Sequence, residues 1–344
     1  MKNKKRILST VIFILLILLA YAFVFKGYSI SKFIETLKNC KPIYLSLAVL
    51  CVCLWVFFEA LFFKVIYKKL GYKISLFNAI GYVFTETYFS AITPSSTGGQ
   101  PVQMIEMSKD EIPYRTSSIV VLVNTMFYKL SLLLIIIIGF MIYHNEIATF
   151  SPLFRAMSIY GFIITTIIVC FFLLLIFSEK TINKILKFLV SIITRVKKTD
   201  ENIEKEDRIN NVLCDYKEAA KYIRNNPKVL LNTFLIIFMQ RLSMLMVNYF
   251  VYKSFNINDI SALYAITINA FLMISVDFMP LPGGVLISEA LLLEVNKKLH
   301  ILSMSKGITL VFRNISFYFL VIVSLIGYLI FHFGKRKKAI KIHE

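Results

Sequence analysis

Six ionisable side chains fall inside long apolar runs of this sequence, where a charge is costly to place. They are Glu59, Glu86, Lys129, Arg241, Asp277 and Arg313. A charged side chain at bilayer depth costs at least ~2.5–3.5 kcal/mol on insertion scales, so such residues normally face a cavity and bind a charged group. Two of them also allow a structural interpretation, because Glu59 lies near the end of its run and Arg241 can form an ion pair with a carboxylate.

Two segments rich in proline and glycine interrupt the apolar sequence. The first, residues 93–101, reads Thr-Pro-Ser-Ser-Thr-Gly-Gly-Gln-Pro, and the second, residues 277–289, contains Pro-Leu-Pro-Gly-Gly. Because neither segment can continue a helix, one helix should stop at each break, and a new one should begin after Gly99 or Gly284 with unpaired backbone N–H groups. Irregular backbone is tolerated at membrane depth only where it lines an enclosed or water-filled cavity. The breaks therefore predict a polar cavity inside a membrane protein.

The same order of features follows both breaks. Each break leads to an acidic residue, Glu106 or Glu289, and then to an apolar run that carries a cation, Lys129 or Arg313. The chain is therefore predicted to contain two copies of one unit.

We expect the breaks and the charges beside them to bind a lipid headgroup. A helix that begins at a break points N–H groups and the positive end of its dipole into the cavity, which suits a phosphate, and the cations would add to that site. The carboxylates would meet a cationic group, with Glu106 and Glu289 facing one common cavity. Asp277 and Arg313 would bind opposite ends of the headgroup, or else form a structural ion pair. The predicted binding residues are Thr93, Gly98, Gly99, Gln100, Glu106, Lys129, Asp277, Pro282, Gly283, Gly284, Glu289 and Arg313.

Composition places the chain in the membrane class. Of its 344 residues, 58% are hydrophobic and 17% are charged, and the mean hydropathy of +0.72 lies outside the range of soluble globular domains. The net charge of +19 comes from basic residues gathered in connecting segments and at the termini. That pattern fits a positive-inside membrane protein that faces anionic headgroups better than a nucleic-acid binder. The five scattered cysteines suggest neither a disulfide framework nor a zinc site.

Apolar runs of the ~20 residues that a helix needs to cross a bilayer recur along the chain. They predict an all-α polytopic membrane protein with about eight transmembrane helices plus two broken or re-entrant helices. The runs are Ile7–Phe25, Pro42–Phe63, Ile74–Ile92, Ser117–Tyr143, Met157–Phe177, Val229–Tyr252, Ile260–Met279 and Ile308–Phe333. The first resembles a signal peptide, but its length favours an uncleaved span.

The chain is predicted to form a single transmembrane domain, 1–344, made of two repeat units at about residues 42–143 and 229–333. Between them, residues 178–228 form the one long polar segment, with twelve basic and eight acidic side chains. The helical spacing of its apolar residues predicts either an amphipathic helix at the interface or an ordinary linker helix. Eight plain crossings would place this segment outside, against the positive-inside rule. If each break instead turns the chain back across the membrane, residues 178–228 lie in the cytoplasm together with both termini. The two units are then inverted copies of each other, and we prefer this interpretation.

No motif for catalysis stands out. The four histidines lie far apart, and the sequence contains no Gly-x-Ser-x-Gly, no Walker loop and no His-x-x-x-His pair. Ser95, Ser96 and Thr97 carry hydroxyls but have no identifiable base, so capping a helix or lining a polar cavity is the favoured role. No catalytic residue, metal ligand or cofactor is predicted.

The two breaks resemble those of the transmembrane domain of the lysylphosphatidylglycerol synthase family, the multiple peptide resistance factor type, and its stand-alone relatives. The matching residues are Thr93-Pro94 with Gly98-Gly99-Gln100-Pro101, and Pro280-Leu281-Pro282-Gly283-Gly284 with Glu289; the likeness extends over nearly the whole chain. It departs from the family pattern at Leu286, where a further glycine is usual. Full-length members make lysyl-phosphatidylglycerol from lysyl-tRNA and phosphatidylglycerol in a soluble synthase domain. They then flip the product to the outer leaflet, which repels cationic antimicrobial peptides.

Three alternative functions remain open, of which the second is the one that the family's name implies. In the first, the protein is a flippase-like translocator in a bacterial-type cell membrane that moves a phospholipid of the phosphatidylglycerol or lysyl-phosphatidylglycerol class, or a polyprenyl lipid, and contributes to antimicrobial peptide resistance. In the second, it is a phosphatidylglycerol lysyltransferase that works with a separate synthase. In the third, it is a membrane scaffold for a lipid-modifying enzyme or a glycosyltransferase. A direct nucleic-acid partner is not expected, and the sequence leaves open whether the chain forms a homo-oligomer.

Overall fold

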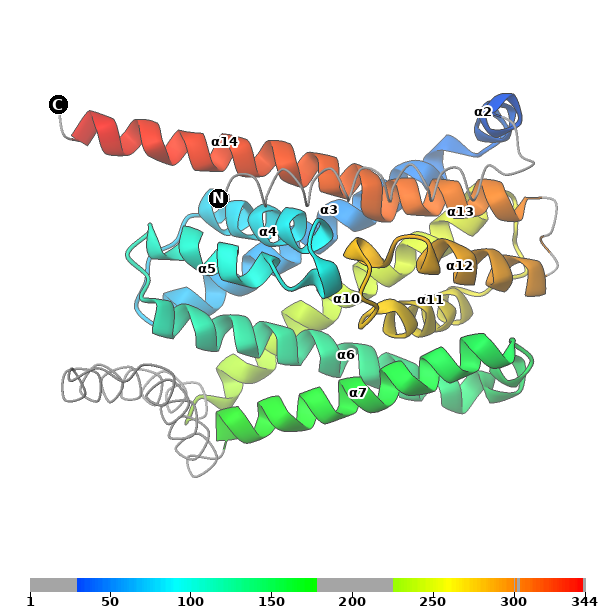
Figure 1. Cartoon of the computed structure of the whole chain (residues 1–344), viewed down its shortest axis with the longest axis horizontal. Coiled ribbons are helices and arrows are strands. Elements are labelled where there is room, and N and C mark those ends of the chain that lie inside the picture. Colours follow the sequence, from blue (N-terminus) through cyan, green and yellow to red (C-terminus); the bar gives the residue numbers. More distant parts are fainter. Residues whose placement is uncertain (1–29, 178–224, 300, 302–303, 343–344) are drawn as a thin grey trace, which may run out of the picture.

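The computed structural model describes residues 30–177, 225–299, 301 and 304–342, and every regular element in this part of the chain is helical (Figure 1). The predicted first span Ile7–Phe25 and the predicted linker helix lie outside the described residues. In chain order the elements are α2 (Ile30–Lys38), α3 (Pro42–Lys69), α4 (Leu76–Ala91), η1 (Pro94–Ser96), α5 (Gly99–Ser108), α6 (Tyr114–Ala148), α7 (Pro152–Phe177), α10 (Pro227–Ser254), α11 (Ala262–Val276), η2 (Pro282–Gly284), α12 (Ile287–Lys298), α13 (Ser305–Arg313), the π-helical turn η3 (Asn314–Tyr318) and α14 (Phe319–Ile342).

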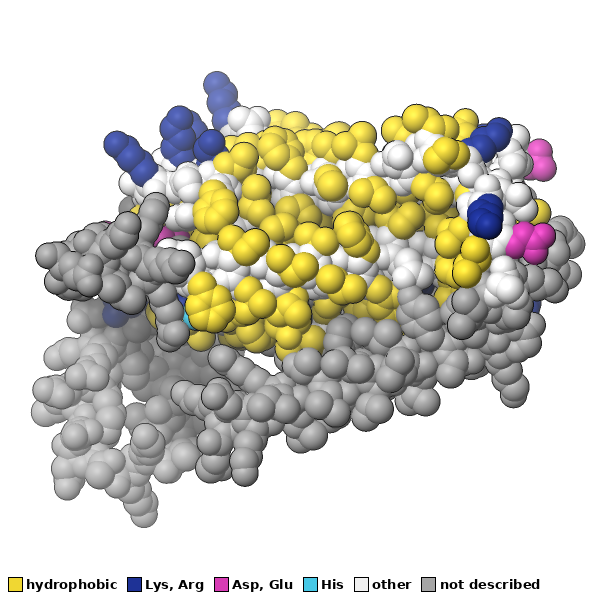
Figure 2. Space-filling view, turned by 90° about the horizontal axis from the view of Figure 1, so that it is seen from above, with side chains coloured by type: hydrophobic (Ala, Val, Ile, Leu, Met, Phe, Trp, Pro, Cys, Tyr) yellow, Lys and Arg dark blue, Asp and Glu magenta, His cyan; other side chains and the backbone are white. Residues whose placement is uncertain are grey.

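Five helical segments in the described part are long and apolar enough to cross a membrane. They are α3, α6, α7, α10 and the continuous segment Ser305–Gly334, which joins α13, η3 and α14. Figure 2 shows a broad hydrophobic band over the middle of one face, with lysine and arginine side chains gathered toward its two ends. A hydrophobic belt between two charged ends is what a bilayer requires of a bundle. The predicted all-α polytopic membrane fold is confirmed.

The two broken segments form helical hairpins that do not cross the bundle. In the first, α4 leads through η1 into α5, and in the second, α11 leads through η2 into α12. The first arms, α4 and α11, are 16 and 15 residues long, which is short of the ~20 residues of a crossing. The amide of Gln103 on α5 donates to the carbonyl of Tyr82 on α4 at 3.2 Å, so the second arm returns along the first. The runs Ile74–Ile92 and Ile260–Met279 are therefore hairpin arms.

The hairpins enter the bundle from opposite ends and meet at their tips (Figure 1). There η1 packs against η2, and Ser95 Oγ donates to the carbonyl oxygen of Met279 at 3.5 Å. Each first arm begins with a serine whose side chain accepts a hydrogen bond from the backbone N–H three residues on, Ser75 at 3.1 Å and Ser261 at 3.2 Å. The two hairpins therefore share the same kind of start and break and point in opposite directions, as an inverted repeat would require.

A helix pair through the middle of the bundle joins the two halves. α3 and α10 pack side by side and run in opposite directions. In Figure 1, α7 ends, α10 begins and α14 ends at one and the same end of the bundle. The two flanks of residues 178–224 therefore lie on the same side as the C-terminal helix.

The two breaks share a backbone conformation although their sequences differ. After the proline of each 3-10 turn, two consecutive residues adopt left-handed angles: Ser95 (φ 50°) and Ser96 (φ 55°) in η1, Gly283 and Gly284 (both φ 60°) in η2. This conformation costs a residue with a Cβ roughly 1–2 kcal/mol and a glycine almost nothing. The two Gly-Gly pairs that indicated the repeat therefore occupy different places, because 283–284 form a turn whereas 98–99 begin α5.

Candidate functional site

A cavity of about 570 Å³ lies where the two hairpin tips meet α3, α6 and α10. This volume is in the range of small-ligand sites. Half of the predicted binding residues line it, namely Gln100, Lys129, Asp277, Gly283, Gly284 and Arg313. The other half lie outside its lining, namely Thr93, Gly98, Gly99, Glu106, Pro282 and Glu289. The breaks thus form a cavity as expected, but only part of the predicted set faces it.

Lys129 and Asp277 form an ion pair across the two halves of the protein. Lys129 Nζ, on α6, lies 2.5 Å from Asp277 Oδ2, just after α11. The rings of Tyr128 and Phe278 lie 5.1 and 4.7 Å from the same nitrogen. The expected alternative of an ion pair between Asp277 and Arg313 is therefore wrong, because Asp277 pairs with Lys129 instead.

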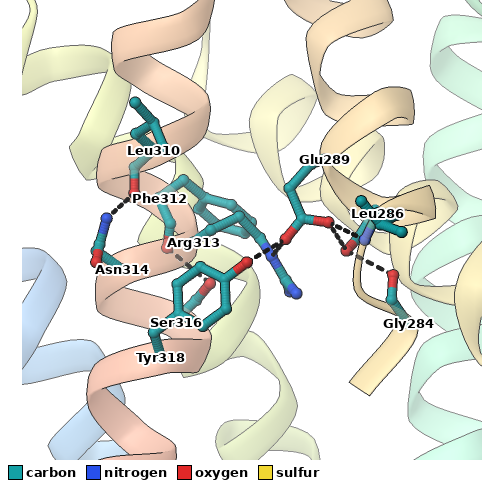
Figure 3. Close-up of polar contacts among 10 residues, drawn as sticks. Gly284, Leu286, Glu289, Leu310, Phe312, Arg313, Asn314, Ser316 and Tyr318 are labelled. Atoms are coloured by element: carbon teal, nitrogen blue, oxygen red, sulfur yellow. Dashed lines mark hydrogen bonds and ion pairs between the residues drawn. The ribbon is translucent and has the colours of Figure 1, made fainter. Parts of the chain in front are cut away.

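Arg313 pairs with Glu289, and this pair holds the second hairpin against α13 (Figure 3). Glu289 Oε1 accepts from Arg313 Nε at 2.6 Å and from the Tyr318 hydroxyl at 2.8 Å. Its other oxygen accepts from the backbone N–H of Leu286 at 2.6 Å and from Ser288 Oγ at 3.1 Å. Glu289 is 2% exposed and caps the start of α12. The helix N-terminus predicted to face a phosphate at this break is occupied by the protein's own carboxylate.

Glu106 has the corresponding role in the first hairpin. Its Oε1 accepts from Lys109 Nζ at 2.6 Å and lies 3.0 Å from Nδ1 of His332, on α14. The carboxylate is 2% exposed and sits in the last turns of α5, away from the break. Glu106 and Glu289 each link one hairpin to the helix beside it, so the expectation that both face a common cavity is not met.

Two further carboxylates, which the sequence marked only as charges in apolar runs, do line the cavity. Glu59 on α3 accepts from the amides of Asn124 at 3.2 Å and Gln240 at 3.1 Å, one on each oxygen. Glu86 on α4 accepts from Ser90 Oγ at 2.7 Å. Asn124 and Gln240 were not predicted as site residues; a carboxamide in an apolar run was the signal that could have found them.

Arg241 on α10 is the third cation of the cavity. Its guanidinium carbon lies 3.5 Å from the centroid of the Tyr128 ring, and Nη1 lies 3.7 Å from the sulfur of Met273. The side chain is 1% exposed, and Nε has no hydrogen-bond partner in the described part of the protein. The cavity therefore carries charges of both signs on five different helices and the second break.

The tip of the first hairpin presents hydroxyls to the cavity. Ser95, Ser96 and Thr97 are exposed and line it. Thr93 does not line the cavity but stabilises the tip, because its Oγ1 accepts a hydrogen bond from the backbone N–H of Gly98 at 2.9 Å. Gln100 Nε2 donates to Thr125 Oγ1 at 2.7 Å and so ties α5 to α6. No group of three or more histidine, cysteine or acidic side chains arranged to hold a metal ion occurs among the described residues.

Comparison with known proteins agrees with this architecture. Residues 6–324 match the family described as the lysylphosphatidylglycerol synthase TM region. A UPF0104 membrane protein of Archaeoglobus fulgidus is 33% identical over 86 residues, which is 24% of this chain and 26% of that protein. The chain thus spans about a quarter of the length of the curated relative it matches. No solved structure matches the chain. Because the family match covers most of the sequence, the chain belongs to the lysylphosphatidylglycerol synthase TM region family.

Proposed function

We propose that this protein moves a phospholipid between the leaflets of a cell membrane through the cavity between its hairpins. The observation that carries the proposal is the meeting of two oppositely directed hairpins, η1 against η2, at a cavity lined by charges and hydroxyls. A polar cavity between re-entrant elements offers a headgroup a path that the hydrocarbon core does not.

The charges of the cavity define the headgroup that it suits. Lys129, Arg241 and Arg313 supply positive charge, and Glu59, Glu86 and Asp277 supply negative charge. A phosphodiester would meet the cations, and a hydroxyl or ammonium group beyond it would meet the carboxylates and the serines. Phosphatidylglycerol and its lysyl ester, the lipid class in the family's name, carry these groups.

The inverted arrangement also suggests how the path would open to each side in turn. Each hairpin enters from one end of the bundle, so movement of the first would open the cavity toward one leaflet and movement of the second toward the other. The C-terminal part of α14 contains the basic sequence Lys335-Arg336-Lys337-Lys338. By the positive-inside rule, the end of the bundle where α7 and α14 end would face the cytoplasm, together with both termini.

Reconstitution tests the proposal directly. The full chain would be placed in vesicles that contain fluorescent phosphatidylglycerol, and dithionite would bleach only the outer leaflet. In protein-free vesicles dithionite should bleach about half of the label. We expect the bleached fraction to exceed half when the protein is present. The double variant Lys129→Gln with Asp277→Asn removes both charges without stranding either, and it should slow movement about tenfold, equivalent to roughly 1.4 kcal/mol.

Asp259→Asn is the matched control, because Asp259 is exposed outside the cavity. This control should move lipid as the unchanged protein does. If the protein leaves lipid sidedness unaltered in vesicles and in cells, while its deletion abolishes lysyl-phosphatidylglycerol itself, a synthase role replaces the translocator.

A further inference from the structure

Arg241 is the one cavity cation in the described part of the chain that has no carboxylate within 4 Å. Lys129 and Arg313 line the same cavity, and each lies 2.5–2.6 Å from an acid supplied by the protein. Arg241 is the most deeply buried of the three, at 1% exposed. The fold thus pairs two of the three buried cations directly with a carboxylate, whereas Arg241 has the attraction of Glu59 without contact between the two charged groups.

The surroundings of Arg241 hold its guanidinium in place without neutralising it. One face lies on the Tyr128 ring at 3.5 Å, and the neighbour of Nη1 is the thioether of Met273, a weak acceptor. The acid of α3 that faces the same cavity, Glu59, accepts amide hydrogen bonds on both oxygens, from Asn124 and Gln240. A guanidinium that is stacked on a ring, and whose Nε lacks a partner, is positioned for an anion that enters from outside the protein.

Unpartnered polar atoms concentrate on this side of the cavity. Among the lining residues of the described part, the buried donors without a partner are Trp55 Nε1, Arg241 Nε and Arg313 Nη2, and the buried acceptors without a partner are Asn124 Oδ1 and Gln240 Oε1. Water can supply hydrogen bonds to such atoms, but it cannot supply a negative charge in direct contact with the guanidinium of Arg241. A headgroup with an anion for the guanidinium and a hydroxyl donor for the amide oxygens would satisfy both kinds of atom.

We propose that Arg241 binds the phosphodiester of a lipid headgroup, and that the free side-chain oxygens of Asn124 and Gln240 accept hydrogen bonds from a hydroxyl group of the same headgroup. A phosphodiester carries one negative charge and two free oxygens, which match the fork of a guanidinium. The assignment of a lipid as the source of the phosphate rests on the proposed function. Glycerol phosphate and inorganic phosphate share the same anion chemistry, so the experiment includes both.

Binding can be followed with the chain's one tryptophan, Trp55, which lines the cavity. The full chain, stripped of lipid in an uncharged detergent, would be titrated with dioleoylphosphatidylglycerol and, in parallel, with dioleoylglycerol, which lacks the phosphate. We expect a saturable fluorescence change and a raised unfolding temperature with the first lipid only. Arg241→Gln should weaken this binding at least about tenfold, Arg241→Lys should weaken it less, and Arg155→Gln, at an exposed arginine of α7, should leave it unchanged.

A second readout separates binding from a structural role. Without lipid, Arg241→Gln should unfold at a temperature no lower than the unchanged protein, because it removes a buried charge that no carboxylate contacts. A clearly lower unfolding temperature in lipid-free detergent, or unchanged lipid binding in this variant, would overturn the assignment. An equal response to glycerol phosphate or inorganic phosphate would assign the site to a soluble anion and overturn the lipid. If the unchanged protein binds the lipid through Arg241 but fails to move it in vesicles, the proposed function fails while the site stands.

Discussion

The pair between Glu289 and Arg313 yields the sharpest test of how the second hairpin is held. Both side chains are buried, and breaking a buried ion pair from one side costs about 3–5 kcal/mol because the other charge is left uncompensated. Arg313→Gln leaves Glu289 with the donors of Tyr318, Leu286 and Ser288. Its cost should therefore fall at the lower end of that range, about 3 kcal/mol.

Glu289→Gln should cost more, about 5 kcal/mol. It leaves Arg313 buried with no carboxylate, supported by the rings of Phe317 at 4.4 Å and Tyr318 at 5.4 Å, and with its Nη2 already lacking a partner. It also weakens the cap on Leu286, whose φ of 76° is unusual for a residue with a side chain. The double variant removes both charges and should recover at least about 2 kcal/mol relative to the sum of the single changes.

The assay is the free energy of unfolding in mixed detergent micelles with rising dodecyl sulfate, followed by Trp55 fluorescence. Tyr318→Phe serves as the internal control, since it removes one hydrogen bond to a charged group and should cost about 1.5–3 kcal/mol without stranding a charge. If the two single changes and the double change are simply additive, Glu289 and Arg313 are not coupled. The account of the hairpin as held by this pair would then be refuted.

Three other predictions concern the hairpins and their direction. Gly99→Ala should destabilise the protein by roughly 1–3 kcal/mol, because its Cβ would lie 2.5 Å from the carbonyl oxygen of Glu86. Gly334→Ala, at a position with open space around it, is the control in the same unfolding assay, and equal stability of the two variants would contradict the close packing. Cysteines placed at Ser95 and Met279 in a cysteine-free chain should form a disulfide on oxidation and stop lipid movement until reduced, measured by dithionite bleaching; movement that continues in the cross-linked protein would show that the tips need not separate. A cysteine at exposed Lys297 should react with an impermeant maleimide in intact cells and one at exposed Lys73 should not, and the reverse labelling would invert the proposed orientation.

The helix breaks could be predicted from the sequence because their cause is local. Proline lacks a backbone donor and cannot continue a helix beyond its first turn, so Pro94 and Pro280 mark where α4 and α11 have to stop. The charges in apolar runs identified Lys129, Asp277 and Arg313 as cavity residues for a similarly local reason, the cost of exposing them to lipid. All three line the cavity.

The pairing of the charges could not be predicted, since it depends on which helices touch. Arg313 pairs with an acid 24 residues away, whereas Lys129 pairs with one 148 residues away in the other half of the chain. Periodicity and spacing do not contain that information. The two Gly-Gly pairs suggested equivalent positions in the two breaks, which they are not. Glycine suits both a left-handed turn, as at Gly283, and a close helix contact, as at Gly99, so the sequence alone does not distinguish the two requirements.

The short hairpin arms also constrain how the protein is made. A 15- or 16-residue arm followed by a break is too short to be inserted as a span, and the returning arms carry buried polar side chains such as Gln103 and Asn296. The first arm α4 packs against α3 and α14, and the first arm of the second hairpin, α11, packs against α6, α7 and α10. Each hairpin thus depends on long helices for its place, and the first hairpin depends on α14, which follows it by more than 200 residues and is the last helix of the described chain.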